Sequence, residues 1–232
     1  TAVVTDENID WLSKLLATAA VLQNTASHSR AHGLAGLTGG TPAGSNHPAS
    51  GERPAMDDLL QVPERVVMVE GAEPSRFGEE KFAGVGDFLR EMNFLGFVDE
   101  SGLTCEVPFT GTTPIAALEE GQQPQTSLVQ MLSAAPHPEA GNGLLCLMRL
   151  PYAADPAEVA ALANMLNATE AQGNTNTMLL GAWCPQPNSD TTLAFCSFVP
   201  NLVHTWVLVE NLVSYFAAHS MFAAEQLVGA LG

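Results

Sequence analysis

Apolar residues recur at helical spacing in several parts of the chain. Between Asp6 and Gln23 they follow steps of three and four residues, which predicts an amphipathic helix with one apolar stripe. The segment Phe77–Phe94 has the same periodicity and ends just before Gly96, a residue type that favours helix termination. The clearest helix start is Asp155-Pro156-Ala157-Glu158, with an N-cap aspartate, then proline and glutamate in the first turn. This third helix is predicted to end at Gly173.

Short apolar or alternating runs predict the strands. The predicted strands are Arg65–Glu70, Leu103–Phe109, Ser127–Leu132, Gly143–Leu150, Thr177–Cys184 and Thr191–Val199. Residues 185–190 separate the last two and have the composition of a turn. From about residue 84 the order is α-β-β-β-α-β-β-α. Direct short links join antiparallel strands, so the predicted fold class is α+β, an antiparallel sheet with packed helices.

The region between the first helix and the first strand has a different composition. Residues 26–55 contain six glycines and three prolines and show no apolar periodicity. Such a stretch buries too little apolar area to offset the entropy of ordering it. The sequence therefore predicts three parts: an N-terminal helix in residues 1–25, a flexible linker or extended arm in residues 26–64, and an α+β domain in residues 65–232.

Charge is scarce and one-sided. The chain carries 25 acidic and 8 basic residues, a net charge of −17, and only 14% of its residues are charged. After Arg90 a single cation remains, Arg149, against 13 acidic residues. This argues against binding to nucleic acid or to anionic lipid, both of which need clustered Lys and Arg. An apolar domain with so little charge is typical of a protein that buries surface against a partner.

The four cysteines, Cys105, Cys146, Cys184 and Cys196, lie in apolar stretches, and none forms a C-x-x-C pair. They are interpreted as reduced core thiols, although strands can bring two of them together without any signal in the sequence. Reduced thiols predict a reducing compartment, the cytoplasm or the interior of an organelle. Because the first residue is Thr1, earlier removal of a targeting peptide stays open.

No residue pattern predicts catalysis. His28 and His32 have the spacing of a helical zinc pair, but the Gly/Ser-rich surroundings favour exposed loop histidines. The nucleophile-elbow, zinc-protease and P-loop motifs are absent from the sequence, and the paired carboxylates are merely adjacent. The sequence therefore predicts no catalytic residue, no metal site and no cofactor.

A long apolar helix is predicted to follow Pro200-Asn201 and to run almost to the end of the chain. Its apolar residues cover more than one stripe, which is typical of a helix buried in a core or an interface. The candidate partner contacts are Trp206, Val209, Val213, Tyr215 and Phe216. The alternative is a core helix packed with the N-terminal helix. Polar residues interrupt every window long enough to span a bilayer, so no membrane insertion is expected.

The element order, together with LLCLMRLP followed by DPAEVAALANMLN, resembles the YbjN family and the wider type III secretion chaperone-like fold. The resemblance is strongest over residues 143–228 and weaker from about residue 84. It implies a small acidic protein, usually dimeric, that holds or regulates other proteins and has no catalytic residues. The first 80 residues and the low charge depart from this pattern.

Two classes of function follow. The first is a non-enzymatic interaction protein, either a chaperone-like adaptor or an accessory or structural subunit of a larger assembly. Its contact, with another protein or with a second copy, is predicted on the C-terminal helix. The second class is a small enzyme or ligand-sensing regulatory module that uses a cleft of the same sheet.

Overall fold

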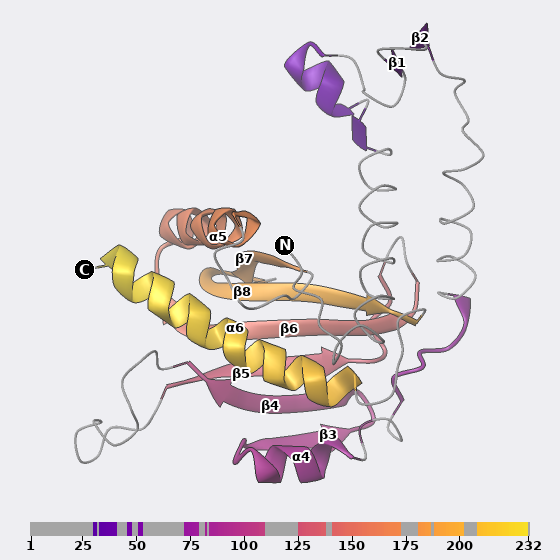
Figure 1. Cartoon of the computed structure of the whole chain (residues 1–232), viewed down its shortest axis with the longest axis vertical. Coiled ribbons are helices and arrows are strands. Elements are labelled where there is room, and N and C mark those ends of the chain that lie inside the picture. The colour runs from indigo at the N-terminus through magenta and orange to yellow at the C-terminus, as the bar shows by residue number, and fades with distance from the viewer. Residues whose placement is uncertain are drawn as a thin grey trace.

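The computed structural model describes residues 30–31, 33–40, 46–47, 51–52, 72–78, 82, 84–109, 125–137, 141–172, 181–186, 188–201 and 208–231. Its body consists of α4 (Val85–Glu91), β3 (Gly96–Asp99), β4 (Gly102–Pro108), β5 (Thr126–Leu132), β6 (Gly143–Ala153), α5 (Pro156–Ala171), β7 (Ala182–Gln186), β8 (Ser189–Pro200) and α6 (Leu208–Leu231). The α+β class predicted from the sequence is confirmed (Figure 1).

The body is built on one six-stranded sheet with the order β3-β4-β5-β6-β8-β7. Every neighbouring pair is antiparallel, as expected for strands joined by direct links. The observed order is α-β-β-β-β-α-β-β-α, one strand more than predicted. The extra strand is β3, which is only four residues long and follows α4 after a short connection. A strand of this length has too few residues to show a clear alternation of apolar and polar side chains.

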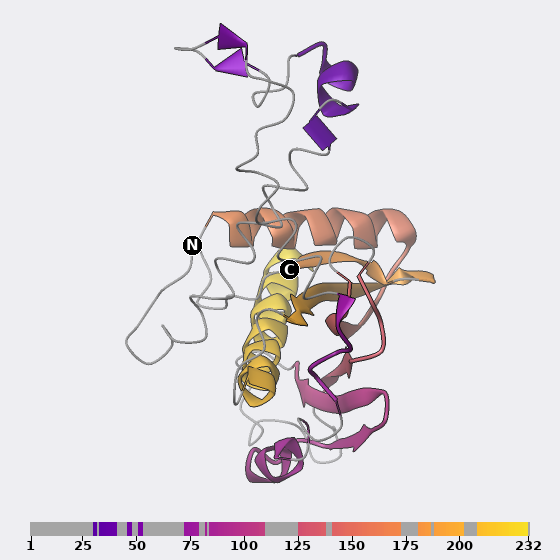
Figure 2. The same cartoon turned by 90° about the vertical axis from the view of Figure 1, so that its right-hand side faces the viewer.

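The helices are gathered on one face and at the two ends of the sheet. Helix α6 crosses the front of the sheet in Figure 1, and the view turned by 90° in Figure 2 places it beside that same face. Helix α5 lies at the β7 end and α4 at the β3 end. Among the residues that the structure describes, no helix covers the opposite face of the sheet.

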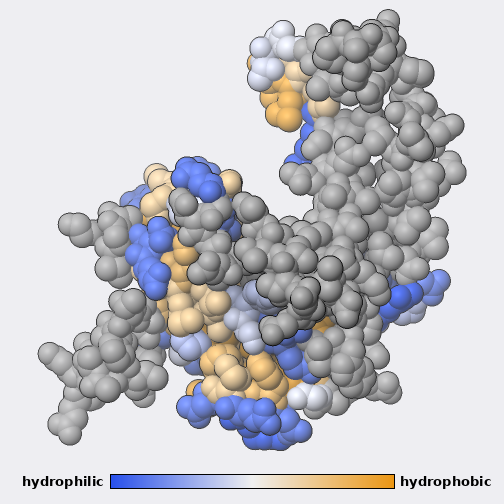
Figure 3. Space-filling model, viewed as in Figure 1, coloured by the Kyte–Doolittle hydropathy of each residue, from blue (hydrophilic) through white to orange (hydrophobic). Residues whose placement is uncertain are grey.

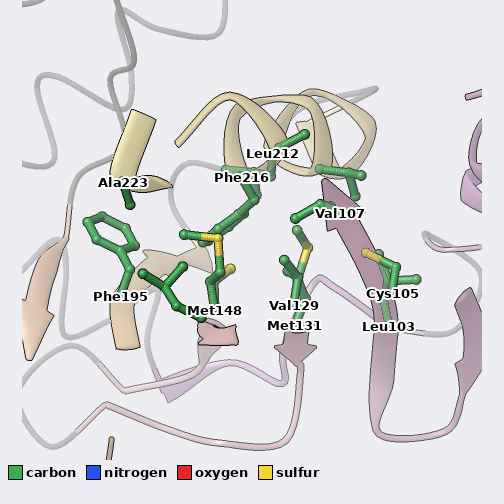
Figure 4. Packing of buried hydrophobic residues seen from close by; sticks show 14 of the residues in the cluster. Leu103, Cys105, Val107, Val129, Met131, Met148, Phe195, Leu212, Phe216 and Ala223 are labelled. Atoms are coloured by element: carbon green, nitrogen blue, oxygen red, sulfur yellow. The ribbon is translucent and has the colours of Figure 1, made fainter. Parts of the chain in front are cut away.

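Alternation along the strands directs one set of side chains toward α6. In β6, Leu144, Cys146, Met148 and Leu150 are buried, and the residues between them are half-buried. The same alternation runs through β4 and β5. Figure 4 shows Leu212 and Phe216 of α6 packed over these side chains. The core therefore forms where the alternate side chains of the strands, which repeat every two residues, pack against the apolar face of α6, which repeats about every 3.6 residues.

The predicted start of the third helix is confirmed in detail. The carboxylate of Asp155 accepts hydrogen bonds from the backbone N–H groups of Ala157 (3.0 Å) and Glu158 (3.1 Å), and Pro156 is the first helical residue. The carboxylate of Glu158 instead accepts a hydrogen bond from the hydroxyl of Tyr152, at 2.7 Å. The strand before it runs beyond the predicted end at Leu150, through Pro151 to Ala153, with a register irregularity that accommodates the proline.

Gly102, at the start of β4, and Asn201, just after β8, fix the backbone at these strand ends. Gly102 has a φ of +142°, and a Cβ there would lie 1.9 Å from the carbonyl oxygen of Met131, so only glycine fits where β4 begins. Asn201, which the sequence suggested as the opening of the last helix, is fully buried. Its side chain binds backbone atoms of Glu73, Pro74 and Arg76, which holds residues 73–76 against the end of β8.

Several predictions concern residues outside the described ranges: the helix at 6–23, the strand at 65–70 and the histidines at 28 and 32. Within the predicted linker, residues 33–38 are helical, and β1 (Asn46–His47) pairs with β2 (Gly51–Glu52). The linker region therefore contains short pieces of regular structure that its lack of periodicity did not indicate.

Candidate interaction surface

The structure describes four of the five predicted contact residues on α6, and Trp206 lies outside the described residues. Val213 and Phe216 have no exposed surface and Val209 only 4%. A partner reaches these three only if α6 leaves the sheet, so the contact that the sequence placed on them is not available in this structure. Tyr215 is half-buried, and burial raises the pKa of its hydroxyl.

The wide apolar surface of α6 has a physical reason within this chain. The helix crosses the sheet over β4 and β5, and its sides meet α4 and α5. Both of its apolar stripes are therefore covered, including Leu208, Leu212 and Ala223 on one and Ala217 and Ala224 on the other. A sheet alone would cover only one side of α6, and here two flanking helices cover more of it.

Large apolar side chains are exposed instead at the opposite end of the sheet from α5. Leu95 is 73% exposed, Phe97 59% and Met92 46%. They lie close together in sequence, between the end of α4 and β3, and are separated by Asn93, Phe94 and Gly96. We call this region, residues 85–99, the α4–β3 corner. Large exposed apolar groups that lie close together mark interaction sites on soluble proteins.

A groove of about 410 Å³ lies between α4 and β3. Although about half of its surface is polar, most of the residues around it are apolar: Phe82, Leu89, Phe94, Phe97 and Val98. Gly86 and Arg90 complete it from α4. A Cβ on Gly86 would meet only the guanidinium of Arg90, at 4.0 Å, so the absent side chain contributes to the open space. The volume is large enough for one or two anchoring side chains.

Strand β3 is the edge of the sheet at this corner. It pairs with β4 on one side, and no described residue hydrogen-bonds to its outer side. Gly96 brings the strand close to its neighbours, because a Cβ there would lie 2.7 Å from that of Cys105 and 2.8 Å from Leu89. The corner thus combines a groove of mixed polarity with a short strand edge to which no described residue hydrogen-bonds, the geometry that accepts an added strand.

The charges around the corner are mostly negative. Asp87 and Glu91 lie on α4, and Asp99 and Glu100 follow at the end of β3. The guanidinium of Arg90 donates to the carboxylate of Asp87. In Figure 3, apolar surface borders the hydrophilic residues at the bottom of the view, where α4 lies. This arrangement favours a partner that is apolar in its middle and positively charged at its flanks.

A second polar cluster lies at the β7 end and is closed by packing. The imidazole of His219 is fully buried, stacked on the indole of Trp183 (ring centroids 5.0 Å apart) and edge-on to Phe195 at 4.3 Å. One carboxylate oxygen of Glu170 lies 3.0 Å from His219 Nε2 and accepts a hydrogen bond from Trp183 Nε1 at 2.6 Å. A histidine paired with a carboxylate is a common catalytic unit, but here its ring is enclosed by two aromatic rings. The arrangement is that of an enclosed core cluster.

Comparison of the chain with protein-family models, with curated proteins and with solved structures finds no match. Within the described ranges, no helix has both the length and the hydropathy of a membrane span. The same ranges contain no group of three or more His, Cys, Asp or Glu side chains placed to hold a metal ion.

The α4–β3 corner was not found from the sequence. Residues 92–98 read MNFLGFV, a largely apolar run without alternation that begins inside the helix predicted for Phe77–Phe94 and extends beyond it. That run was a signal that could have been used, but apolar runs of this length are more often buried than exposed.

Proposed function

We propose that the chain is a non-enzymatic protein-interaction domain, a chaperone-like adaptor or an accessory subunit of a larger assembly. It binds an extended segment of another protein at the α4–β3 corner. The observation that carries this proposal is the exposure of Met92, Leu95 and Phe97 beside a groove and a sheet edge that no described residue pairs with.

The energy of such a contact is sufficient for a specific complex. Burying one large apolar side chain contributes about 1.5–3 kcal/mol, before the cost of association is subtracted. The corner offers three exposed side chains of this size. The added strand also gains hydrogen bonds to β3, although a four-residue edge limits their number. Affinity therefore depends mainly on the side chain that enters the groove.

Charge restricts the kind of segment that fits. Four carboxylates surround the corner, and its one cation, Arg90, is engaged with Asp87. The partner segment that matches is an extended run in which apolar residues alternate with Lys or Arg. Attraction between the segment and this negatively charged chain speeds association and weakens as salt is added.

This proposal keeps the class of function expected from the sequence. It places the contact at the α4–β3 corner, whereas the sequence placed it on α6. It also agrees with what the resemblance to YbjN-like chaperones implies, a protein that holds other proteins. The alternative of an enzyme or ligand sensor in a cleft of the sheet has less support. The groove at the corner contains a single charged group, Arg90, and no described histidine or cysteine.

The experiment measures binding of a fluorescent peptide of alternating leucine and lysine, about seven residues long, to the full chain by anisotropy. Phe97→Ser should weaken binding about 10- to 150-fold, the equivalent of one lost large apolar contact. Gly86→Leu should also weaken it, because the new side chain fills the groove while favouring the helix. Met221→Ser is the matched control, since Met221 is 40% exposed on α6.

Two further probes separate a specific contact from general attraction to an acidic protein. A peptide with proline at its centre has the same charge but lacks one backbone donor, and it should bind more weakly. Equal binding of both peptides to all variants would contradict the proposal. Light scattering tests whether a second copy of the chain, and not a different protein, binds at the corner. A dimer that Phe97→Ser converts to a monomer would show that it does.

A further inference from the structure

Two of the four cysteines lie side by side on the sheet. Cys184 of β7 is opposite Ala194, and Cys196 of β8 is opposite Ala182, so the two are diagonal neighbours on one face. Their Sγ atoms are 3.5 Å apart, within reach of a thiol hydrogen bond. Both are half-buried, whereas Cys105 and Cys146 are buried. The sequence interpretation of four core thiols therefore holds for two of them and not for this pair.

We propose that Cys184 and Cys196 form a reversible thiol–disulfide site that reacts with low-molecular-weight disulfides of the glutathione class. The site rests on the placement of these two side chains and is independent of the contact at the α4–β3 corner. It lies at the other end of the sheet, on the face that no described helix covers.

The two thiols have different reactivity. A hydrogen bond from Cys196 stabilises the thiolate of Cys184 and lowers its pKa to about 7, while the same contact and burial raise the pKa of Cys196. Arg149 of β6 is opposite Ala194, which is itself opposite Cys184, so this cation belongs to the same row across the sheet. We assign Cys184, on the edge strand β7, as the attacking sulfur, because the thiolate is the nucleophile, and the single-cysteine variants below test this order.

The reaction proceeds in two steps that balance. The thiolate of Cys184 attacks one sulfur of glutathione disulfide, forms a mixed disulfide and releases one glutathione thiolate, which takes up a proton. Cys196 then loses its proton and attacks the sulfur of Cys184, which closes the internal disulfide and releases a second glutathione. The two protein thiols are oxidised and the glutathione disulfide is reduced to two thiols.

The position of the pair explains why the bond should be easily reversed. Diagonal neighbours have Cα atoms about 7–8 Å apart, slightly beyond the usual range for a disulfide. Closing the bond requires a small shift of β7, which is an edge strand with a register irregularity between Pro185 and Gln186. A disulfide closed against such a shift is more readily reduced than an unstrained one.

The experiment uses the folded full chain in mixtures of reduced and oxidised glutathione, quenched with acid, alkylated and cut with trypsin. Arg149 is the single cation after Arg90, so trypsin releases residues 91–149 and 150–232 as separate peptides. The peptide 150–232 carries Cys184 and Cys196, and the other carries Cys105 and Cys146. We expect the first to lose two hydrogen atoms and accept no alkyl group, while the second is alkylated at both cysteines after unfolding.

Single variants test the order of the steps. In Cys196→Ala the reaction should stop at the mixed disulfide on Cys184, and the pH midpoint for its alkylation should rise from about 7 toward the ordinary value near 9.0. In Cys184→Ala, Cys196 should stay reduced. Cys146→Ala is the control, because burial raises the pKa of that thiol and removes it from reaction.

Three results would overturn the proposal: no loss of hydrogen from the peptide 150–232 at any ratio of the two glutathione forms, a disulfide that joins two chains, or oxidation that occurs only in denaturant. Circular dichroism of each variant checks that the chain is folded when it is measured, and a variant that fails to fold is replaced by the corresponding serine variant.

Discussion

The two edge strands of the sheet, β7 and β3, differ in whether the chain provides hydrogen-bond partners for their outer backbone groups. At the β7 edge, the side-chain amide of Asn167 accepts from the backbone N–H of Trp183 and donates to its carbonyl, both at 2.9 Å. One side chain of α5 thus replaces a neighbouring strand. At the β3 edge, no described residue provides such a partner, and Phe97 remains 59% exposed. One edge is therefore closed by the chain's own helix, whereas no described residue closes the other.

This difference shows that a single side chain is enough to occupy backbone groups of an edge strand. Open edges invite pairing with other chains, and proteins usually cover them with a helix, a charge or a bulge. Here the helix covers β7 through a single amide in the fourth turn of α5, while the indole of Trp183 packs beneath it on His219. The β3 edge is restricted only by its length of four residues.

The largest expected effect on the free energy of unfolding comes from replacing a phenylalanine by alanine, and we compare Phe195 in β8 with Phe97 in β3. Phe195 is fully buried and contacts Trp183, Phe216 and His219. Phe195→Ala should lower the free energy of unfolding by about 3–5 kcal/mol. Phe97→Ala should change it by no more than about 0.5 kcal/mol, because the side chain is largely exposed. Urea denaturation followed by circular dichroism measures both, and equal losses would contradict the assignment of a free corner.

A somewhat smaller effect is expected from opening the closed edge. Asn167→Ala leaves the N–H and the carbonyl of Trp183 without partners in a residue that is 2% exposed. The loss should be about 2–4 kcal/mol, since two groups lose their partners and each costs about 1–2 kcal/mol at an edge strand, the lower part of the range for unsatisfied buried groups. The same measurement of unfolding serves here. Asn164→Ala, at an exposed position of the same helix, is the control and should be neutral.

Loss of the N-cap of α5 should have an effect of about 1 kcal/mol. Asp155→Ala removes the acceptor for two backbone donors at the start of the helix that covers β7. Hydrogen exchange should increase first in the initial turn of α5. Asp190→Ala, an exposed aspartate at the start of β8, should leave exchange in α5 unchanged, and an equal effect of both would argue against capping.

The smallest effect concerns the turn between β3 and β4. The hydroxyl and N–H of Ser101, followed by the N–H of Gly102, donate to the carboxylate of Asp99 and lower its pKa below 3.8. Because the pKa is lower in the folded state, the stabilisation is complete above pH 4 or so and is lost as the pH falls through the folded value. Unfolding measured across this range should show a small acid-side loss that Asp99→Asn, which keeps an acceptor, does not show.

Much of the fold was predictable because local signals agreed with packing. The residues of β4 alternate clearly, β5, β6 and β8 each contain a short apolar run, and the start of α5 is marked by three residues of a known cap. The antiparallel pairing followed from the short links. The strand β3 was missed because its four residues, GFVD, contain no complete alternation.

The site was less predictable because exposure depends on the neighbours that the fold supplies. Val213 and Phe97 are both apolar residues in apolar runs, yet one is fully buried and the other mostly exposed. The difference arises from α4, α5 and the sheet surrounding α6 on several sides. Likewise, the contact between Cys184 and Cys196 depends on the register of β7 against β8, which the spacing of the two residues does not specify.

The side-chain amide of Asn167 also limits how many chains can join the sheet by strand addition. A sheet that grows by strand addition can form a fibre only when both of its edges accept a neighbour. In this chain the β7 edge is occupied by its own helix, so growth is confined to β3. A protein that pairs at β3 therefore completes a one-to-one complex or a closed two-fold pair. The exposed apolar corner can thus be kept without leading to open-ended assembly.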